Sequence, residues 1–101
     1  MARFRVRLDP RAEEDARRAF LWYAERRAAA AADFQAVLTR AVEDLTETAL
    51  AWPEKELGVR ARVLDRYPYT LFYRVAEDAV LVVAVAHQKR MPGYWRRRAP
   101  R

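Results

Sequence analysis

Residues 59–86 read VRARVLDRYPYTLFYRVAEDAVLVVAVA and predict three consecutive strands. Runs rich in β-branched and aromatic residues cover 59–64, 70–75 and 79–86, and the turn-forming stretches DRYPY and AED separate them. Connections this short permit only antiparallel hairpins. The last run is apolar at every position, so we expect it to be a central strand that is covered on both faces.

The N-terminal residues predict one further strand and the start of a helix. In RFRVRL, residues 3–8, arginine and apolar residues alternate, which is typical of a strand with one face in the core. Asp9 can accept hydrogen bonds from free N–H groups at a helix start, and Pro10 suits the first helical position. We therefore expect a first helix from Pro10 to about residue 26.

A second helix is expected between the first helix and the three strands. Apolar residues recur at helical spacing from Phe34 through Leu50, and Trp52-Pro53 ends the pattern. One helix of this combined length would outgrow so small a domain, so we place a tight Ala-rich corner at residues 27–30. The predicted fold is α+β, in the order β-α-α-β-β-β, with a helical hairpin packed on a mainly antiparallel four-stranded sheet.

Length and composition limit the class of protein. The chain of 101 residues suits one domain, residues 1–101, and it contains no cysteine, which excludes disulfides and thiolate metal sites. With one histidine and no cysteine, neither a metal site nor a cofactor is expected. No apolar run is long enough to cross a bilayer and the N-terminus lacks the apolar segment of a signal peptide, so we expect a cytoplasmic protein that does not contact membranes.

The positive charge of the chain is concentrated at its C-terminus. The formal net charge is +6, and HQKRMPGYWRRRAPR, residues 87–101, contains six basic residues and no acidic one. Basic and acidic residues therefore balance over residues 1–86. A basic segment of this kind predicts a polyanionic partner, which charge alone does not identify as nucleic acid or as an acidic protein.

Three segments together with the order of elements resemble the RelE/ParE superfamily of bacterial toxins. They are LDPRAEEDARRAFLWYAE near the N-terminus, VLDRYPYTLFYRV in the middle and VAVAHQKRMPGYW near the C-terminus. The resemblance covers nearly the whole chain, and its most specific parts are the strand pair around YPY and the ending formed by His87, Arg90, Pro92 and Trp95. It implies a plasmid-stabilisation toxin from a two-gene toxin–antitoxin module, with a ParD-like antitoxin partner in a hetero-oligomer.

The superfamily divides by target, and the residues favour one branch. RelE-like members cut messenger RNA on the ribosome, whereas ParE-like members poison DNA gyrase and are not nucleases. RelE-like chains place lysines before the YPY-type turn and arginines after it and near the C-terminus, where this chain has Ala61, Val63, Thr70 and Gln88. The resemblance therefore implies a ParE-like gyrase poison with no catalytic residues. The alternative is a ribosome-dependent endonuclease, with the candidate catalytic residues Arg90, Tyr94, Arg60 and Arg62.

Within the C-terminal segment, the candidate residues for binding the target are His87, Arg90, Tyr94, Trp95 and Arg97. Each also has a structural interpretation. His87 at a strand end is expected to be hydrogen-bonded to backbone or to Tyr94, and Trp95 is expected to be a lid over the sheet. The alternative for Tyr94 and Trp95 is stacking on nucleic acid bases. The arginines that follow can also be a solvated end.

A second candidate site consists of strand arginines that would bind the antitoxin. Its residues are Arg3, Arg5, Arg60 and Arg62, with Arg7 on the same face of the first strand. One interpretation is that they form a basic groove for an acidic antitoxin segment. The other is that they only solubilise the edges of the sheet, and the sequence leaves both open.

Overall fold

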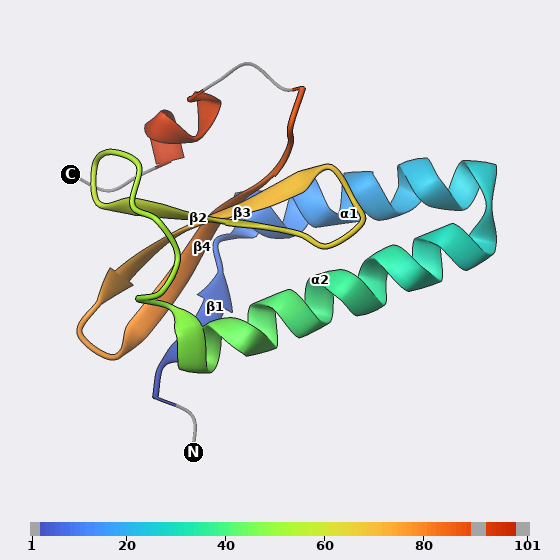
Figure 1. Cartoon of the computed structure of the whole chain (residues 1–101). Helices are drawn as coiled ribbons and strands as arrows, with labels where there is room; N and C mark the ends of the chain where they lie inside the picture. Colours follow the sequence, from blue (N-terminus) through green and yellow to red (C-terminus); the bar gives the residue numbers. More distant parts are fainter. Residues whose placement is uncertain (1–2, 90–92, 99–101) are drawn as a thin grey trace.

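The computed structural model describes residues 3–89 and 93–98. In chain order, the elements are β1 (Arg5–Leu8), α1 (Pro10–Arg26), α2 (Ala28–Thr48), β2 (Val59–Val63), β3 (Tyr69–Ala76), β4 (Ala79–His87) and the 3-10 helix η1 (Tyr94–Arg98). Helices α1 and α2 form a hairpin that extends beyond the sheet, and η1 lies on the other side of the sheet near β2 and β3 (Figure 1).

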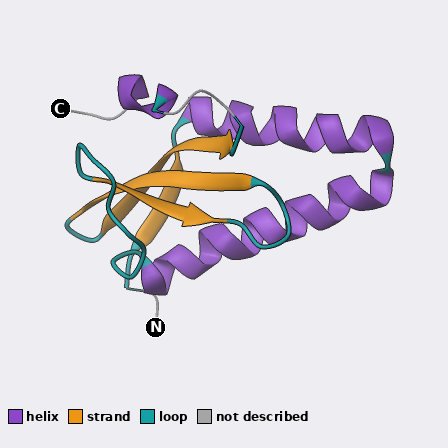
Figure 2. Ribbon diagram, turned by 45° about the horizontal axis from the view of Figure 1, so that its top comes forward, coloured by secondary structure: helices purple, strands orange, loops and turns teal. Residues whose placement is uncertain are grey.

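The four strands form one sheet in the order β1-β4-β3-β2. The pairs β2–β3 and β3–β4 are antiparallel, and β1 runs parallel to β4. Figure 2 shows the sheet in front of the two helices. These observations confirm the α+β class, the order of elements and the central position of β4. The parallel pairing of β1 is the feature that no local pattern indicated.

The helical hairpin begins and turns at residues that the sequence singled out. The Asp9 carboxylate accepts a hydrogen bond from the Arg11 N–H at 2.8 Å, and Pro10 is the first helical residue. Hydrogen bonding from Arg11 also lowers the pKa of Asp9. Arg27 is extended, with φ −164°, and it alone separates the two helices. The predicted corner at 27–30 is thus shorter than expected, because the alanines from Ala28 onward begin α2.

A β-bulge changes the facing of side chains in the middle of β4. The register with β3 moves from Phe72↔Ala84 to Tyr73↔Val82, which leaves Val83 as the extra residue. Before the bulge Val82 joins the core beneath the helices, and after it Ala84 joins the smaller cluster on the opposite side. Side chains therefore cover β4 on both faces, as its uninterrupted apolar sequence predicted.

Strand β1 pairs with only the first half of β4. Its last paired residue, Leu8, lies opposite Val82. Beyond Val82, no other strand of the described residues lies on that side of β4. The backbone groups on that edge need other partners, because an unpaired buried N–H or C=O costs free energy.

The main core lies between the sheet and the hairpin. Its fully buried side chains include Phe34, Leu45, Leu71 and Tyr73. On α1 the buried residues are Ala12, Asp15 and Ala19, while Phe20 and Tyr23 are only partly buried. Among the described residues, neither helix combines the length and apolar character that a bilayer-spanning helix requires.

Candidate functional site

The C-terminal segment is fixed on the sheet by Trp95. This side chain is only 5% exposed and its ring stacks on Phe72, with the ring centroids 5.1 Å apart and an interplanar angle of 23°. It also packs with Val59 and Ala84 on the side of the sheet opposite the helices. The expectation that Trp95 is a lid over the sheet is confirmed. Its ring is occupied by protein contacts and not open for stacking on bases.

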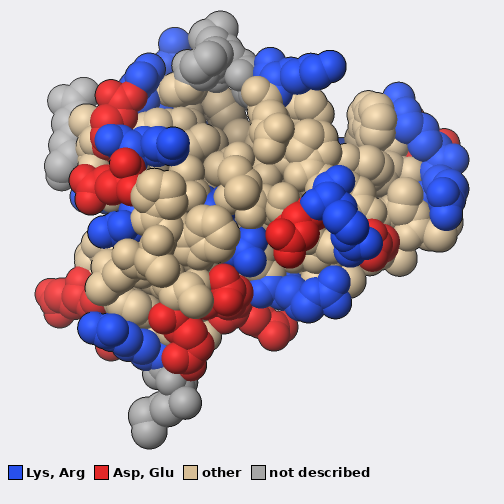
Figure 3. Space-filling model, viewed as in Figure 1, with Lys and Arg blue, Asp and Glu red and all other residues tan. Residues whose placement is uncertain are grey.

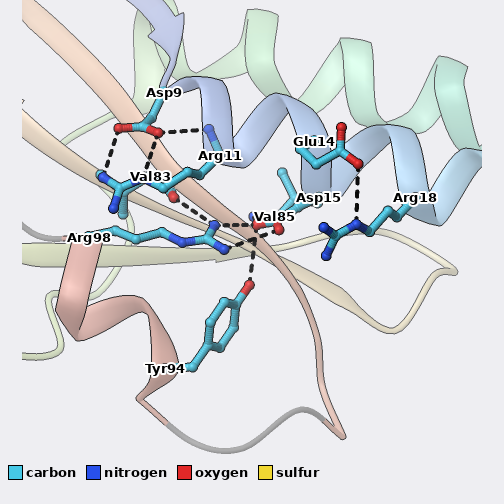
Figure 4. Close-up of polar contacts among 9 residues, drawn as sticks. All are labelled: Asp9, Arg11, Glu14, Asp15, Arg18, Val83, Val85, Tyr94 and Arg98. Atoms are coloured by element: carbon cyan, nitrogen blue, oxygen red, sulfur yellow. Dashed lines mark hydrogen bonds and ion pairs between the residues drawn. The ribbon is translucent and has the colours of Figure 1, made fainter.

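Asp15 on α1 holds the same segment from the other side. Its Oδ2 lies 2.6 Å from Nη1 of Arg98 and 3.3 Å from the hydroxyl of Tyr94, which donates to it. Nη2 of Arg98 donates to Oδ1 at 3.3 Å, so the guanidinium contacts both carboxylate oxygens. Figure 4 shows the three side chains converging from α1 and η1 next to β4. This Asp15 cluster, consisting of Asp15, Tyr94 and Arg98, anchors η1 to the body of the protein.

The Asp15 cluster also completes the edge of β4 where β1 ends. The Val85 N–H donates to Oδ2 of Asp15 at 3.0 Å, and the Val83 carbonyl accepts from Nη1 of Arg98 at 3.2 Å. A carboxylate and a guanidinium thus take the places that a neighbouring strand's carbonyl and N–H would occupy. The ion pair is therefore part of the sheet's hydrogen bonding as well as a link between elements.

Asp15 is a site residue that was not among the candidates predicted from the sequence. The available signal was its spacing, because Asp15 lies three residues after Ala12 and four before Ala19 on the buried face of α1. A carboxylate at such a position needs an internal partner. No local pattern identifies that partner as Arg98, which is 83 residues away.

His87 ends β4 close to this cluster. Its Nδ1 accepts a hydrogen bond from the Lys89 N–H at 3.0 Å, and its ring lies edge-on to Tyr69 with centroids 5.1 Å apart. Burial raises the pKa of Tyr69. The expectation of a strand-end histidine bonded to backbone is confirmed.

The described arginines of the C-terminal segment differ in their surroundings. Arg98 has a side chain only 14% exposed, which makes the interpretation as a solvated end wrong for this residue. Arg96 pairs with Glu56 in the loop before β2, and Arg97 is exposed. Arg90, which is a candidate residue for binding the target, and Arg101 lie outside the described residues.

Arg60 and Arg62 face the helices and have internal partners. Arg60 donates to the Trp52 carbonyl at 2.6 Å. Arg62 lies 3.3 Å from the Asp44 carboxylate and above the Trp52 ring, 4.7 Å from its centroid. Between them and the end of α2, the hydroxyl of Tyr73 donates to the Ala49 carbonyl at 2.6 Å, and burial raises the pKa of Tyr73 to about 12.

The structure separates residues that the sequence analysis grouped together. Arg3 and Arg5 are near the β1 edge, whereas Arg60 and Arg62 lie on β2 at the opposite edge. The four therefore do not line one basic groove. The nuclease candidates are divided as well, because Tyr94 packs on the side of the sheet opposite Arg60 and Arg62.

Two other features bear on what the surface can bind. Within residues 3–89 and 93–98, no three His, Asp or Glu side chains gather as a metal-binding set. In the view of Figure 3, basic side chains predominate at the far end of the helical hairpin, whereas acidic and basic side chains are interleaved elsewhere.

Known proteins resemble this chain over most of its length. The family described as ParE toxin of type II toxin-antitoxin system, parDE, matches residues 6–92. Among solved structures, a chain of the chromosomal ParDE TA system from P. aeruginosa superimposes with a TM-score of 0.75 at 18% sequence identity, over 84% of this chain and 96% of that one. No curated protein matches the chain significantly.

Proposed function

Because this chain belongs to the ParE toxin family of type II toxin–antitoxin systems, we propose that it acts in the cytoplasm by inhibiting DNA gyrase and that a ParD-like antitoxin neutralises it. The proposal has two parts that can be tested separately. One concerns the target and the C-terminal segment. The other concerns the antitoxin and the helical hairpin.

The observation that carries the first part is the anchoring of the basic helix η1 to the sheet and to α1. Trp95 is buried and Arg98 is partly buried on either side of exposed Arg97, and Arg96 is held by Glu56. A cation presented from a fixed backbone loses less conformational entropy on binding than one on a flexible end. Arg97, with Arg90 nearby in sequence, is therefore the proposed contact to gyrase or to gyrase-bound DNA.

The arrangement of side chains counts against the alternative, a ribosome-dependent endonuclease. Cleavage of RNA needs cations and proton donors that converge on one phosphate. Arg60 and Arg62 are bonded to the Trp52 carbonyl and to Asp44 on the helix side of the sheet, whereas the Tyr94 hydroxyl donates to Asp15. These groups would have to break internal bonds and cross the sheet to act together.

The second part rests on an apolar groove along the helical hairpin. The groove has a volume of about 660 Å³, and side chains from β1, α1 and α2 line it, among them Leu8, Ala16, Phe20, Leu38 and Val42. Charged residues, including Arg17 and Glu43, border it. An apolar groove with a charged border suits an amphipathic antitoxin segment that folds on binding.

The test of the target uses purified gyrase. The wild-type toxin is expected to inhibit supercoiling and to increase cleaved DNA, and Arg97→Gln is expected to weaken both effects. Arg17→Gln on α1 removes the same charge from a distant exposed site and serves as the control. Undiminished supercoiling together with codon-positioned cleavage of ribosome-bound message would instead favour the endonuclease.

The test of the antitoxin is titration calorimetry with the product of the gene next to the toxin gene. Phe20→Asp places a charge in the apolar groove and is expected to weaken binding strongly. The Phe20→Asp variant is expected to inhibit gyrase as the wild type does, because Phe20 lies on the helix side of the sheet, opposite η1. Full affinity of Phe20→Asp would place the antitoxin elsewhere.

A further inference from the structure

The side of the sheet opposite the helices is only partly covered by η1. Trp95 covers the part formed by Val59, Phe72 and Ala84. Towards the β1 edge the same side continues with a row of paired residues, in which Arg7 lies opposite Leu81 and Leu81 opposite Arg74. Their sequence neighbours Val6, Leu8, Tyr73, Val75, Val80 and Val82 all pack in the core beneath the helices. Alternation along each strand therefore places Arg7, Leu81 and Arg74 on the side away from them.

Arg5 belongs to the same surface. It precedes Arg7 by two residues on β1, which corresponds to a separation of about 7 Å along a strand. We call Arg5, Arg7 and Arg74 with Leu81 between them the arginine face. Both β1 arginines are exposed, and the side chain of Arg5 is 81% exposed. A hollow of about 340 Å³ lies at Arg5, Val6, Arg7 and Ala79.

The electrostatics of the arginine face favour an anionic partner. Arg5 pairs with Asp78 at 3.2 Å, with Asp78 itself 64% exposed. An exposed ion pair of this kind contributes little to stability and can exchange its carboxylate for another anion at low cost. Arg7 lies within the same hollow. Two arginines spaced by one strand repeat match the spacing of successive phosphates along a nucleic acid backbone.

We propose that the arginine face docks on the phosphate backbone of duplex DNA without reading its base sequence. Duplex DNA suits the surface because it presents regularly spaced phosphates to arginines that are spaced along a strand. Single strands bind mainly by stacking on exposed aromatic rings, and in the described part of this face Phe72 is already stacked under Trp95. An acidic peptide would need apolar pockets for its side chains, whereas here the partly buried Leu81 stands between arginines.

This inference goes beyond inhibition of gyrase, since it assigns to the toxin itself a contact with DNA. The arginine face lies on β1, β4 and β3, away from Arg97 in sequence and on separate elements. The experiment contains no gyrase, so its outcome is independent of whether gyrase is the target.

The test is fluorescence anisotropy with a short labelled duplex, starting at about 50 mM salt, where phosphate contacts are strong. The variant is Arg5→Gln/Arg7→Gln. The matched control is Arg18→Gln/Arg26→Gln, which removes the same charge from exposed positions on α1 outside the apolar groove. The β1 variant is expected to lose on the order of ten-fold in affinity, and the slope of log affinity against log salt is expected to fall by about 2, because two phosphate contacts are lost. The control is expected to change affinity by less than about two-fold.

Several outcomes would overturn the proposal. Equal losses in the two double variants would mean that only net charge matters. Tighter binding of a single strand than of the duplex, or competition by poly-glutamate as effective as by unlabelled duplex, would assign the face to another partner. Absence of wild-type binding at low salt would also overturn it. Thermal unfolding of both variants checks that the fold is retained, since all four side chains are exposed.

Discussion

The carboxylate of Asp15 and the guanidinium of Arg98 form a buried ion pair with a closest distance of 2.6 Å, although 83 residues separate them in sequence. Their side chains are 5% and 14% exposed. The pair also satisfies the backbone of β4 at Val83 and Val85, where strand β1 has ended. It therefore joins α1, β4 and η1, and the position of the basic C-terminal segment depends on it.

Loss of either partner is expected to destabilise the whole domain. Arg98→Ala leaves the Asp15 carboxylate buried without its counter-ion, and such changes cost about 3–5 kcal/mol. Urea unfolding measures the free energy. The double variant Asp15→Ala/Arg98→Ala is expected to cost less than the sum of the single variants, because neither isolated charge remains. Additive costs would show that the two side chains act independently. Arg17→Ala, which breaks an exposed pair with Glu14, is the control and is expected to have little effect.

The parts of the fold that sequence predicts are those with local causes. Asp9 and Pro10 begin α1 where their own chemistry places the start, and the apolar run in β4 indicates a central strand. The parallel pairing of Leu8 with Val82 has no local signal, since more than 70 residues of chain lie between the two. The bulge at Val83 is likewise a product of packing on both faces of β4.

In the candidate site, too, some features can be predicted from the sequence and others cannot. The lid formed by Trp95 was predictable, because a large indole in a short C-terminal segment is usually buried. The roles of Arg60 and Arg62 were not, because alternation along β2 shows that they share a face but not which face. The structure turns them toward the helices, where the Trp52 carbonyl and Asp44 bind them.

Tyr73→Phe is expected to destabilise the protein through the end of α2. The hydroxyl donates to the Ala49 carbonyl at 2.6 Å in a fully buried position. Its removal leaves that carbonyl without this donor, which costs about 1–3 kcal/mol. Thermal and urea unfolding at pH 7 measure the loss. Tyr67→Phe, a partly buried tyrosine that donates to Asp33, is the comparison and is expected to cost less.

The same residue predicts instability in alkali. Burial raises the pKa of Tyr73 from 10.0 to about 12, so the folded protein keeps a proton that the unfolded chain loses first. This contribution to stability is fully present below pH 10 and is lost as the pH rises towards 12. We expect the free energy of unfolding to fall over that range in the wild type and to fall less in Tyr73→Phe. Equal pH profiles for the two proteins would contradict this assignment.

Trp95→Ala is expected to destabilise the domain by about 3–5 kcal/mol, because it removes a large buried ring from Phe72, Val59 and Ala84. Trp95→Phe keeps an aromatic ring on Phe72 and is expected to cost less. Urea unfolding of both variants measures the difference. If Trp95→Ala unfolds at the wild-type urea concentration, the lid does not contribute to stability.

Charge on the C-terminal segment can be tested separately from its anchoring. Arg96→Gln/Arg97→Gln leaves Trp95 and Arg98 in place, so the fold is expected to unfold at nearly the wild-type temperature; the exposed pair of Arg96 with Glu56 contributes little. Inhibition of gyrase supercoiling is expected to fall clearly, because cations near a polyanionic or acidic surface raise the association rate and stabilise the complex.

The matched control, Arg17→Gln/Arg18→Gln, carries the same net charge and is expected to retain inhibition. Full inhibition by Arg96→Gln/Arg97→Gln would exclude these two arginines from the target contact. A loss that occurs only together with a lower melting temperature would instead show that Arg96 anchors the segment.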